Sequence, residues 1–369
     1  MRGRFRVPRR YNMVHTSTPF FDPRDLAPDE FLSRVISQGV PVATGRRLMA
    51  RVVGRGIFDR RELNQHHQIA RRLCDAMGDL PRLRLVDSVV SPIDRFRKLA
   101  FATHDDLVIE TVLIPLEKPG AVSVCLSSQV GCPMGCTFCA TARMPDRRNL
   151  ATWEMVDQFI QARAWAWREG RRVTGAVFMG MGEPFLNYDR VMAAAETMSA
   201  PFGGAVSGAA ITISTVGLAP EIDRFTRERR RFRISISLGA ATDDKRRVVV
   251  PLAAETPVRE VMAAARRHIT ARGQGRVMLA YVCISGFNCG DDDARELGRL
   301  IGDTPVRLDL IEVTDPTGRF QPPTAAELKQ FRDALTRHVG QPVVRRYSGG
   351  KDIAAACGTL AGSLTLAHV

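Results

Sequence analysis

The sequence predicts an α/β fold, a partial (β/α)6 barrel preceded by a small helical domain. From residue 121 onward, apolar runs with strand character alternate with segments of helical periodicity. The strand-like runs are 122–127, 174–180, 210–215, 232–238, 277–284 and 306–313. Six such units indicate a parallel sheet with right-handed crossovers, closed or partly closed. In sheets of this kind the chemistry lies in the loops at the carboxyl ends of the strands.

Three segments are expected ahead of the barrel. Residues 1–24 are rich in Arg and Pro and show no periodicity, which indicates a basic disordered arm. Apolar residues at helical spacing, Val35 among them, predict a helical accessory domain over residues 25–90. Residues 91–120 contain the strand-like run Leu107–Leu113 and are expected to form a β-rich extension.

The predicted barrel core covers residues 121–320. Within it, the pattern at 153–168 predicts a helix whose apolar face includes Trp167. The remaining residues, 321–369, open with a capping box, Thr324-Ala-Ala-Glu327, which marks the start of a helix. A strand and a loop with the last cysteine are expected after that helix.

Bulk composition is that of an ordinary globular enzyme. The chain has 369 residues, of which 45% are hydrophobic and 25% charged. No apolar run approaches the ~18 residues that a membrane-spanning helix requires. The basic N-terminus is not followed by an apolar segment, which argues against a secretory signal. A cytoplasmic protein without membrane contact is expected.

The formal net charge is +14, and the sequence pI is about 10.1. Such an excess of Lys and Arg favours a polyanionic partner, because these side chains release counterions from phosphates. An Arg-rich solvated surface, produced by a GC-rich genome, explains the charge equally well. Charge alone therefore leaves two explanations open, a nucleic-acid partner and a solvated basic surface.

Three of the eight cysteines lie close together, directly after the strand-like run at 122–127. Cys132, Cys136 and Cys139 follow the spacing C-x3-C-x2-C, which lets three thiolates surround one metal centre. Structural zinc sites need four ligands, and no fourth Cys or His lies nearby in the sequence. A [4Fe–4S] cluster normally takes four thiolates, so three would leave one iron open to a substrate. The alternative, cysteines buried together by coincidence, explains this spacing poorly.

A second motif, Met179-Gly-Met-Gly182-Glu183-Pro184, follows the next strand-like run of the barrel. Glycines at a strand end let the backbone approach a ligand closely. The carboxylate of Glu183 can hold an ammonium group. A simple strand-to-helix turn would look similar, but the position of this motif one unit after the cysteines favours a ligand site.

Together these residues resemble the radical S-adenosylmethionine (SAM) superfamily, whose C-x3-C-x2-C loop and Gly-Glu segment bind a [4Fe–4S] cluster and SAM. The sequence further resembles the RlmN/Cfr family, which methylates a ring carbon of adenine in RNA. The matching segments are Cys125-Leu-Ser-Ser-Gln-Val-Gly-Cys132, Arg148-Asn149-Leu150, Gly180-Met-Gly-Glu-Pro184 and Asp352-Ile-Ala-Ala-Ala-Cys357-Gly. The likeness runs from roughly Pro28 to Gly362 and implies a radical-SAM barrel.

The resemblance also implies a mechanism that uses two cysteines. An adenine C2 or C8 is not nucleophilic, so ordinary methyl transfer fails there. In the family pattern Cys357 first accepts a methyl group, and a second SAM yields a 5′-deoxyadenosyl radical that takes a hydrogen atom from it. The methylene radical adds to adenine, and Cys125 then attacks the Cys357 sulfur to close a transient disulfide. One cluster and two SAM per turnover follow.

Further site residues come from the resemblance alone. Glu110 matches the proposed proton acceptor of the family, although strand alternation would equally make it a solvent-facing residue. The expected cofactor-binding positions are Gly182, Glu183, Ser214, Ser237, Leu238, Gly239 and Asp315.

Two of these positions depart from the family pattern. The family commonly has His where this chain has Gly239. The segment that ends at Asp315-Pro316 is one residue longer than usual, and Asp315 replaces the usual Asn. Both departures affect the cofactor or substrate pocket.

The implied partners are RNA, with 23S ribosomal RNA first and transfer RNA second, and an electron donor such as flavodoxin or ferredoxin. Arg345, Arg346 and Lys351 flank the Cys357 loop and are candidates for phosphate contacts, whereas the run Arg229–Arg233 is expected at the opposite end of the barrel.

Two other functions stay open. One is a radical enzyme of the same fold with another substrate, and the other is a non-catalytic, cluster-stabilised RNA-binding protein. The other three cysteines, Cys74, Cys283 and Cys289, are expected to be structural.

Overall fold

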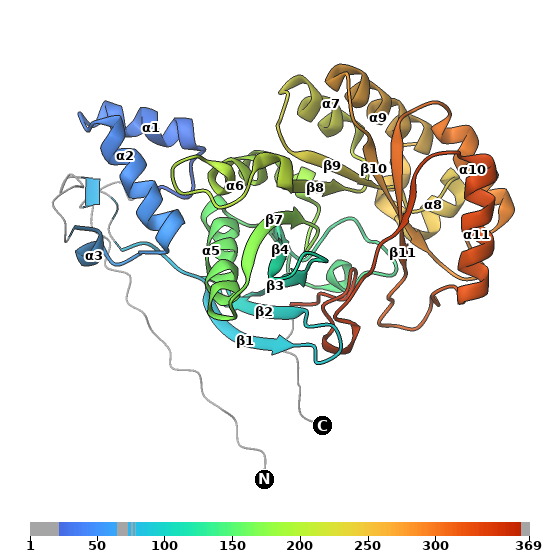
Figure 1. Cartoon of the computed structure of the whole chain (residues 1–369), viewed down its shortest axis with the longest axis horizontal. Helices are drawn as coiled ribbons and strands as arrows, with labels where there is room; N and C mark the ends of the chain where they lie inside the picture. Colours follow the sequence, from blue (N-terminus) through green and yellow to red (C-terminus); the bar gives the residue numbers. More distant parts are fainter. Residues whose placement is uncertain (1–21, 65–72, 75–76, 78, 363–369) are drawn as a thin grey trace, which may run out of the picture.

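A computed structural model describes residues 22–64, 73–74, 77 and 79–362 of the chain. Three short helices lie to one side of the barrel (Figure 1). They are α1 (Pro28–Ser37), α2 (Val42–Met49) and α3 (Arg60–Asn64), with a π-helical turn, η1 (Ala50–Gly54), after α2. Helix α1 begins with a proline and two acidic residues, which suit the first turn of a helix. Phe31, Val35 and Leu48 form the buried side of this group.

A ten-stranded sheet forms the centre of the molecule, in the order β1-β2-β3-β4-β7-β8-β9-β10-β11-β12. The first four strands pair antiparallel: β1 (Arg84–Val90), β2 (Arg97–Ala102), β3 (Val108–Pro115) and β4 (Ala121–Cys125). The others continue from β4 in parallel: β7 (Arg172–Phe178), β8 (Ile211–Thr215), β9 (Arg233–Ser237), β10 (Val277–Cys283), β11 (Val306–Glu312) and β12 (Val343–Arg345). All six strands predicted for the barrel are present, which confirms the α/β barrel class.

Helices follow the parallel strands along the outside of the sheet (Figure 1). They are α5 (Thr152–Arg168), α6 (Tyr188–Ser199), α7 (Ala219–Arg227), α8 (Asp243–Val249), α9 (Val258–Arg272), α10 (Asp291–Ile301) and α11 (Ala325–His338). The predicted capping box of α11 is confirmed, since the Thr324 hydroxyl accepts from the Glu327 amide. None of the helices in the described residues is long and apolar enough to span a bilayer.

Short elements complete the loops: β5 (Gln129–Val130), β6 (Arg148–Asn149), η2 (Ala140–Arg143), η3 (Pro184–Asn187), η4 (Gly208–Ala210), η5 (Pro251–Glu255) and η6 (Lys351–Ile353). The two-stranded pair β5–β6 lies apart from the main sheet. The predicted division of the chain into five segments stays a prediction.

The prediction for Trp167 is wrong, because its side chain is 80% exposed. In the last turns of α5 the buried face passes through Ala162 and Ala166. Successive residues of an α-helix are about 100° apart around its axis. Trp167 therefore points away from the face that Ala166 buries.

The predicted arm also needs a correction at its end. Residues 1–21 lie outside the described residues, but Asp22 and Arg24 are buried. The Arg24 guanidinium contacts Asp22 Oδ2 at 2.5 Å and Asp157 Oδ1 at 3.3 Å. Two carboxylates satisfy the guanidinium away from water, so this end of the basic segment packs against α5 rather than into solvent.

Candidate active site

Two adjoining cavities lie at the carboxyl ends of the parallel strands, where the sequence predicted the chemistry. The larger one is lined by residues of β7, β8, β9, β10 and β11 and of the loops that follow β7, β8, β9 and β11. Its predicted members are Cys136, Cys139, Gly182, Glu183, Ser214, Ser237, Gly239 and Cys357. The smaller cavity is lined by Cys125, Cys139, Arg346, Tyr347 and Cys357 among others. Cys139 and Cys357 line both, so the structure places Cys357 between the cysteine loop and Cys125.

The loop with Cys132, Cys136 and Cys139 depends on a glycine. Gly131 has φ of 61°, and a Cβ there would lie 2.4 Å from the carbonyl oxygen of Asp146. Only glycine fits this close approach. The Cys139 amide donates to the Cys136 carbonyl at 3.0 Å, which turns the loop back on itself.

Burial raises the pKa of all three thiols, and the neighbouring sulfurs raise the pKa of Cys136 further. For Cys132 the pKa rises to about 12. A thiolate is therefore unfavourable here unless a positive centre compensates its charge, as bound iron does. Among the described residues, no three His, Cys, Asp or Glu side chains converge on a single metal ion. In a [4Fe–4S] cluster the thiolates bind separate irons, so three sulfurs need not converge on one ion and would leave the fourth iron open.

Glu183 is held rigidly at the wall of the larger cavity. Its carboxylate accepts from the Phe185 amide at 3.0 Å and from the Val216 amide at 2.8 Å. Burial raises its pKa to about 7, and these backbone hydrogen bonds lower it in part. Such a carboxylate gains most from a cationic partner, which fits the expected ammonium group of SAM. Gly182 has φ of 101°, and a Cβ there would meet the Gln129 side chain at 2.6 Å.

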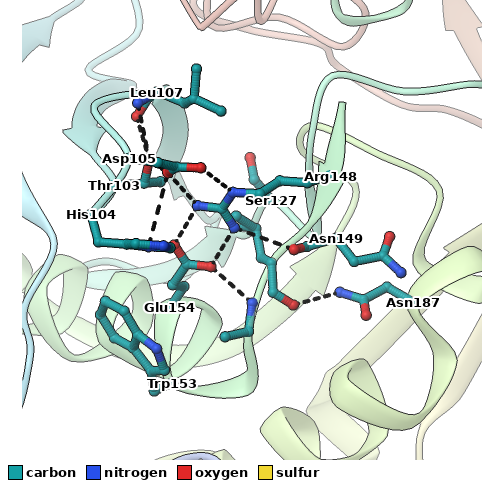
Figure 2. A network of polar contacts seen from close by, with 12 residues as sticks. Thr103, His104, Asp105, Leu107, Ser127, Arg148, Asn149, Trp153, Glu154 and Asn187 are labelled. Atoms are coloured by element: carbon teal, nitrogen blue, oxygen red, sulfur yellow. Dashed lines mark hydrogen bonds and ion pairs between the residues drawn. The ribbon is translucent and has the colours of Figure 1, made fainter. Parts of the chain in front are cut away.

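The segment Arg148-Asn149, which forms β6, contacts the residues that hold the Gly182-Glu183 turn. Figure 2 shows the Arg148 guanidinium between the carboxylates of Asp105 and Glu154. The Glu154 side chain also accepts from the Ala151 amide at the start of α5. The Arg148 contact holds the pKa of the Asp105 carboxyl well below its usual range. This network anchors β6 to the β2–β3 turn and to α5.

Asn149 links this network to the Gly182-Glu183 turn through Gln129. Its Oδ1 accepts from Gln129 Nε2 at 2.7 Å, and Gln129 Oε1 accepts from the Glu183 amide at 2.8 Å. Asn149 also donates to the Leu186 carbonyl. Arg148 and Asn149 are thus positioning residues for the Gly182-Glu183 turn.

The predicted strand-end residues occupy different places. Ser214 and Ser237 line the larger cavity, with their hydroxyl oxygens 3.4 Å apart. Leu238 is fully buried and does not line it. Gly239 lines it with φ of 78°, and a Cβ there would meet Val250 at 3.2 Å. A side chain such as the His of the family is strained in this backbone conformation, which accounts for the departure.

The structure does not place Asp315 in the cavity. Its carboxylate accepts from the Thr317 and Phe320 amides and from Arg143 Nη2, at 2.9, 3.1 and 3.2 Å. These contacts cap its own loop. The preceding residue, Thr314, lines the larger cavity, and its buried hydroxyl has no hydrogen-bond partner among the described residues. Because this segment is one residue longer than usual, Thr314 rather than Asp315 lines the cavity. The extra residue was the signal in the sequence that could have identified Thr314.

Glu110 is buried, which contradicts the solvent-facing alternative, and it lines neither cavity. Its role as a proton acceptor stays a prediction. Lys98 Nζ lies 2.9 Å from Glu110 Oε1, and both side chains are almost fully buried. Glu110 Oε2 accepts from the Ala361 and Gly362 amides at 2.8 and 3.1 Å. Lys98 also donates to the Ala354 carbonyl at 3.4 Å. The ion pair therefore holds the chain on both sides of Cys357.

Other contacts tie the same loop to the rest of the site. The Cys357 amide donates to Ser348 Oγ at 3.0 Å. The Ala140 amide, next to the cysteine loop, donates to the Gly358 carbonyl at 2.7 Å. Burial raises the pKa of the Cys125 thiol to about 12, and the nearby Cys357 sulfur adds to this rise. Cys125 is buried whereas Cys357 is exposed, and both residues line the smaller cavity.

Glu110→Ala is expected to release the Cys357 loop. It removes the acceptor of two backbone amides and leaves the Lys98 ammonium buried without a counter-charge. Breaking a buried ion pair in this way costs about 3–5 kcal/mol. Hydrogen exchange followed by mass spectrometry should show lost protection at Ala361 and Gly362. Glu110→Gln keeps an acceptor oxygen and should keep most of that protection.

Asp157→Asn provides the matched control for Glu110→Ala, since it weakens the buried pair with Arg24. It should lower stability while exchange at residues 354–362 stays unchanged. If Glu110→Gln abolishes catalytic turnover while the loop keeps its protection, Glu110 handles a substrate proton and the positioning role is wrong.

Comparison with known proteins places these features in a family. The Radical SAM superfamily pattern matches residues 126–300. A probable RNA methyltransferase of Anaeromyxobacter sp. (strain Fw109-5) is 45% identical over 87% of this chain and 94% of its own length. The dual-specificity RNA methyltransferase RlmN of Pelobacter propionicus is 40% identical over 74% of this chain and 77% of its own.

A solved structure agrees with the sequence relatives. The crystal structure of a radical SAM methyltransferase from Sphaerobacter thermophilus superposes with a TM-score of 0.83 and 36% identity. The superposition covers 92% of this chain and 99% of that one.

Proposed function

This chain belongs to the radical SAM superfamily and to its RlmN group of RNA methyltransferases, and from that membership we propose that it methylates an adenine ring carbon in 23S ribosomal RNA. Transfer RNA is the second substrate we propose, since the relative from Pelobacter propionicus is named a dual-specificity enzyme. The observation that supports the proposal is the pair Cys125 and Cys357, which line one cavity beside the cysteine loop. A plain methyltransferase or an RNA-binding module has no use for this pair.

Family membership brings a [4Fe–4S] cluster and SAM as cofactors. When bound, they supply a carbon radical that can take a hydrogen atom from an unactivated methyl group. We assign Cys132, Cys136 and Cys139 as the cluster ligands. Glu183 holds the SAM ammonium, and Thr314, Ser214 and Ser237 contribute hydroxyl groups to the same cavity. A flavodoxin or ferredoxin is the proposed electron source.

The chain contributes two thiols that react one after the other, Cys357 first and Cys125 second. Cys357, exposed and lining both cavities, would accept a methyl group from one SAM and hold it where the cluster and a second SAM would supply the radical chemistry. Loss of a hydrogen atom from that methyl group would let its carbon bond to the adenine ring, and the ring would regain its aromaticity by giving up its own proton and one electron, the electron to the cluster. Cys125, buried on β4, would then attack the Cys357 sulfur as a thiolate. The sulfur–sulfur bond forms as the carbon–sulfur bond breaks, and the carbon keeps the electron pair and takes up a proton to become the methyl group of the released base. Loss of this carbon–sulfur bond is what frees the RNA.

The basic residues near Cys357 divide into two kinds. Arg345 is paired with Glu312 at 2.5 Å, so its charge is already matched. Arg346 lines both cavities and contacts the Met179 sulfur, and Lys351 is exposed. At the opposite end of β9, Arg230 pairs with Glu228 and Glu196. Phosphate contacts are therefore assigned to Arg346 and Lys351.

Arg346→Ala is expected to weaken RNA binding and to flatten its salt dependence. Each phosphate contact to a single strand contributes about 0.7 to the slope of log affinity against log salt concentration. A salt titration of a labelled ribosomal RNA fragment should show a loss of about that size. Arg231→Ala, at the far end of the barrel, is the control and should leave the slope unchanged. A flat salt response in the unsubstituted protein would mean that the basic surface is incidental.

The product itself tests the proposed function. Mass spectrometry of RNA nucleosides from cells with and without this gene should reveal a methyladenosine that depends on the gene. Fragmentation separates C2 from C8 methylation, and isolation of ribosomal and transfer RNA separates the substrates. A methyl group on a ring nitrogen or on ribose would contradict the two-cysteine mechanism.

A further inference from the structure

One aromatic ring stands at the mouth of the smaller cavity without a role in the proposed chemistry. Tyr347 lines this cavity together with Cys125 and Cys357, yet its side chain is 68% exposed. Exposed side chains usually keep rotamer freedom, because solvent gives them nothing to pack against. Tyr347 is different, since contacts from a distant part of the chain fix the direction of its ring.

Asp94 and Phe96, in and after the turn that follows β1, provide these contacts. The Tyr347 hydroxyl donates to Asp94 Oδ2 at 2.9 Å, and the same oxygen accepts from the Gly350 amide at 2.7 Å. Phe96 meets the ring edge to face, with centroids 6.2 Å apart and planes at 73°. The hydrogen bond to Asp94 raises the pKa of Tyr347, so the phenol stays protonated and remains a donor.

Gly349 shows how tightly the ring is seated. A Cβ at this position would lie 2.5 Å from Asp94 Oδ2, 2.5 Å from Phe96 Cε2 and 2.7 Å from Tyr347 Cε1. Any other residue would therefore displace the ring or its two supports. These contacts fix an aromatic ring that remains mostly exposed.

The residues around Tyr347 indicate which kind of ligand its ring binds. Arg346 precedes it and lines both cavities, and Lys351 lies exposed shortly after it. An ordered aromatic ring beside cations is the arrangement by which proteins hold single-stranded nucleic acid, since bases stack on the ring and phosphates contact the cations. A ring carbon of a base stacked inside a duplex cannot reach Cys357 at the cavities, so the target nucleotide must leave its stack.

We propose that Tyr347 is a stacking platform for an unpaired base of the RNA substrate, held ready by Asp94 and Phe96. The proposal rests on RNA as the substrate and adds the requirement that the bound segment is unpaired. Tyr347 then selects loops and bulges over helices, while Arg346 contributes affinity without regard to pairing.

The test compares binding of two labelled RNA hairpins by full-length protein. In one hairpin an adenine lies in the loop, and in the other the same adenine is paired. Stacking contributes about 1–3 kcal/mol per base, so Tyr347→Ala should weaken binding of the unpaired form by about 5–150-fold, at 1.4 kcal/mol per tenfold. Binding of the paired form should change little. Tyr347→Phe keeps the ring and should bind within about threefold of the parent.

Two controls distinguish the loss of base stacking from a structural collapse of the loop that contains Tyr347. Trp167→Ala removes another exposed aromatic side chain, on the outer surface of α5, and should not change the affinity. The salt slope should be the same for Tyr347→Ala and the parent, because no phosphate contact is lost. If Tyr347→Ala binds the unpaired hairpin as tightly as the parent, the platform is overturned. The same holds if Tyr347→Ala flattens the salt slope, or if Tyr347→Phe loses as much affinity as Tyr347→Ala.

The outcome is independent of the methylation product. If the parent protein prefers the unpaired hairpin through Tyr347 but forms no ring-methylated adenine, the proposed function fails and the platform stands. If methylation proceeds and Tyr347→Ala binds normally, the platform fails and the proposed function stands.

Discussion

Replacing Cys125 with Ala is expected to trap the protein covalently on its RNA. Cys357 can still accept a methyl group and join its carbon to adenine, since neither step needs Cys125. Without the second thiol, nothing attacks the Cys357 sulfur to break the carbon–sulfur bond. The trapped species should appear as a slow band on a denaturing gel that nuclease treatment removes. Multiple-turnover methylation should fall to background.

Cys357→Ala is the matched variant, and it should give no slow band on the denaturing gel. It removes the methyl acceptor, so neither methylation nor a covalent species should form. It should keep its iron, because the proposed ligands lie elsewhere. In the unsubstituted protein, peptide mass spectrometry should find Cys357 heavier by one CH₂. Normal turnover by Cys125→Ala, or the absence of a methyl group on Cys357, would refute the two-cysteine mechanism while leaving the cluster assignment intact.

The second large effect concerns Cys132, Cys136 and Cys139. Replacing any one with Ala should abolish SAM cleavage, because a [4Fe–4S] cluster held by three thiolates cannot spare a ligand. Anaerobic reconstitution of the parent should give a brown protein with about four irons per chain. Iron and sulfide analysis, together with the visible spectrum, measures this directly.

Cys283→Ala serves as the control, since Cys283 is a buried cysteine at the end of β10. It should bind iron as the parent does, with at most a modest loss of stability. Recovery of one zinc and no sulfide from the parent would contradict the cluster assignment. Full iron content in Cys136→Ala would contradict the ligand set.

The parts of the fold that sequence reasoning predicted correctly are governed by local rules. All six barrel strands follow from apolar runs, and the start of α11 follows from the Thr324-Glu327 capping box. The cysteine loop and the Gly182-Glu183 turn are equally local, because short spacing already brings their residues together. Their place at the carboxyl ends of the strands is a property of every parallel sheet of this kind.

The parts that could not be predicted depend on contacts between distant segments. Glu110 looked like either a solvent-facing residue or a proton acceptor, and only its contact with the Ala361 and Gly362 amides reveals a third role. Thr314 gains its place because Asp315 turns into its own loop. Trp167 fits a helical face by spacing, but the end of α5 buries only its alanines. No periodicity carries information of this kind.

The Lys98–Glu110 ion pair, which clamps the chain on both sides of Cys357, also has a consequence for the order in which the protein folds. Chains fold largely from the N-terminus onward during translation, so the β2–β3 hairpin and the cysteine loop exist before Cys357 emerges from the ribosome. A chain broken between Glu183 and Cys357 keeps the radical-generating residues and lacks the acceptor for the radical. Late arrival of the clamped loop therefore makes the radical step productive only after the acceptor has docked.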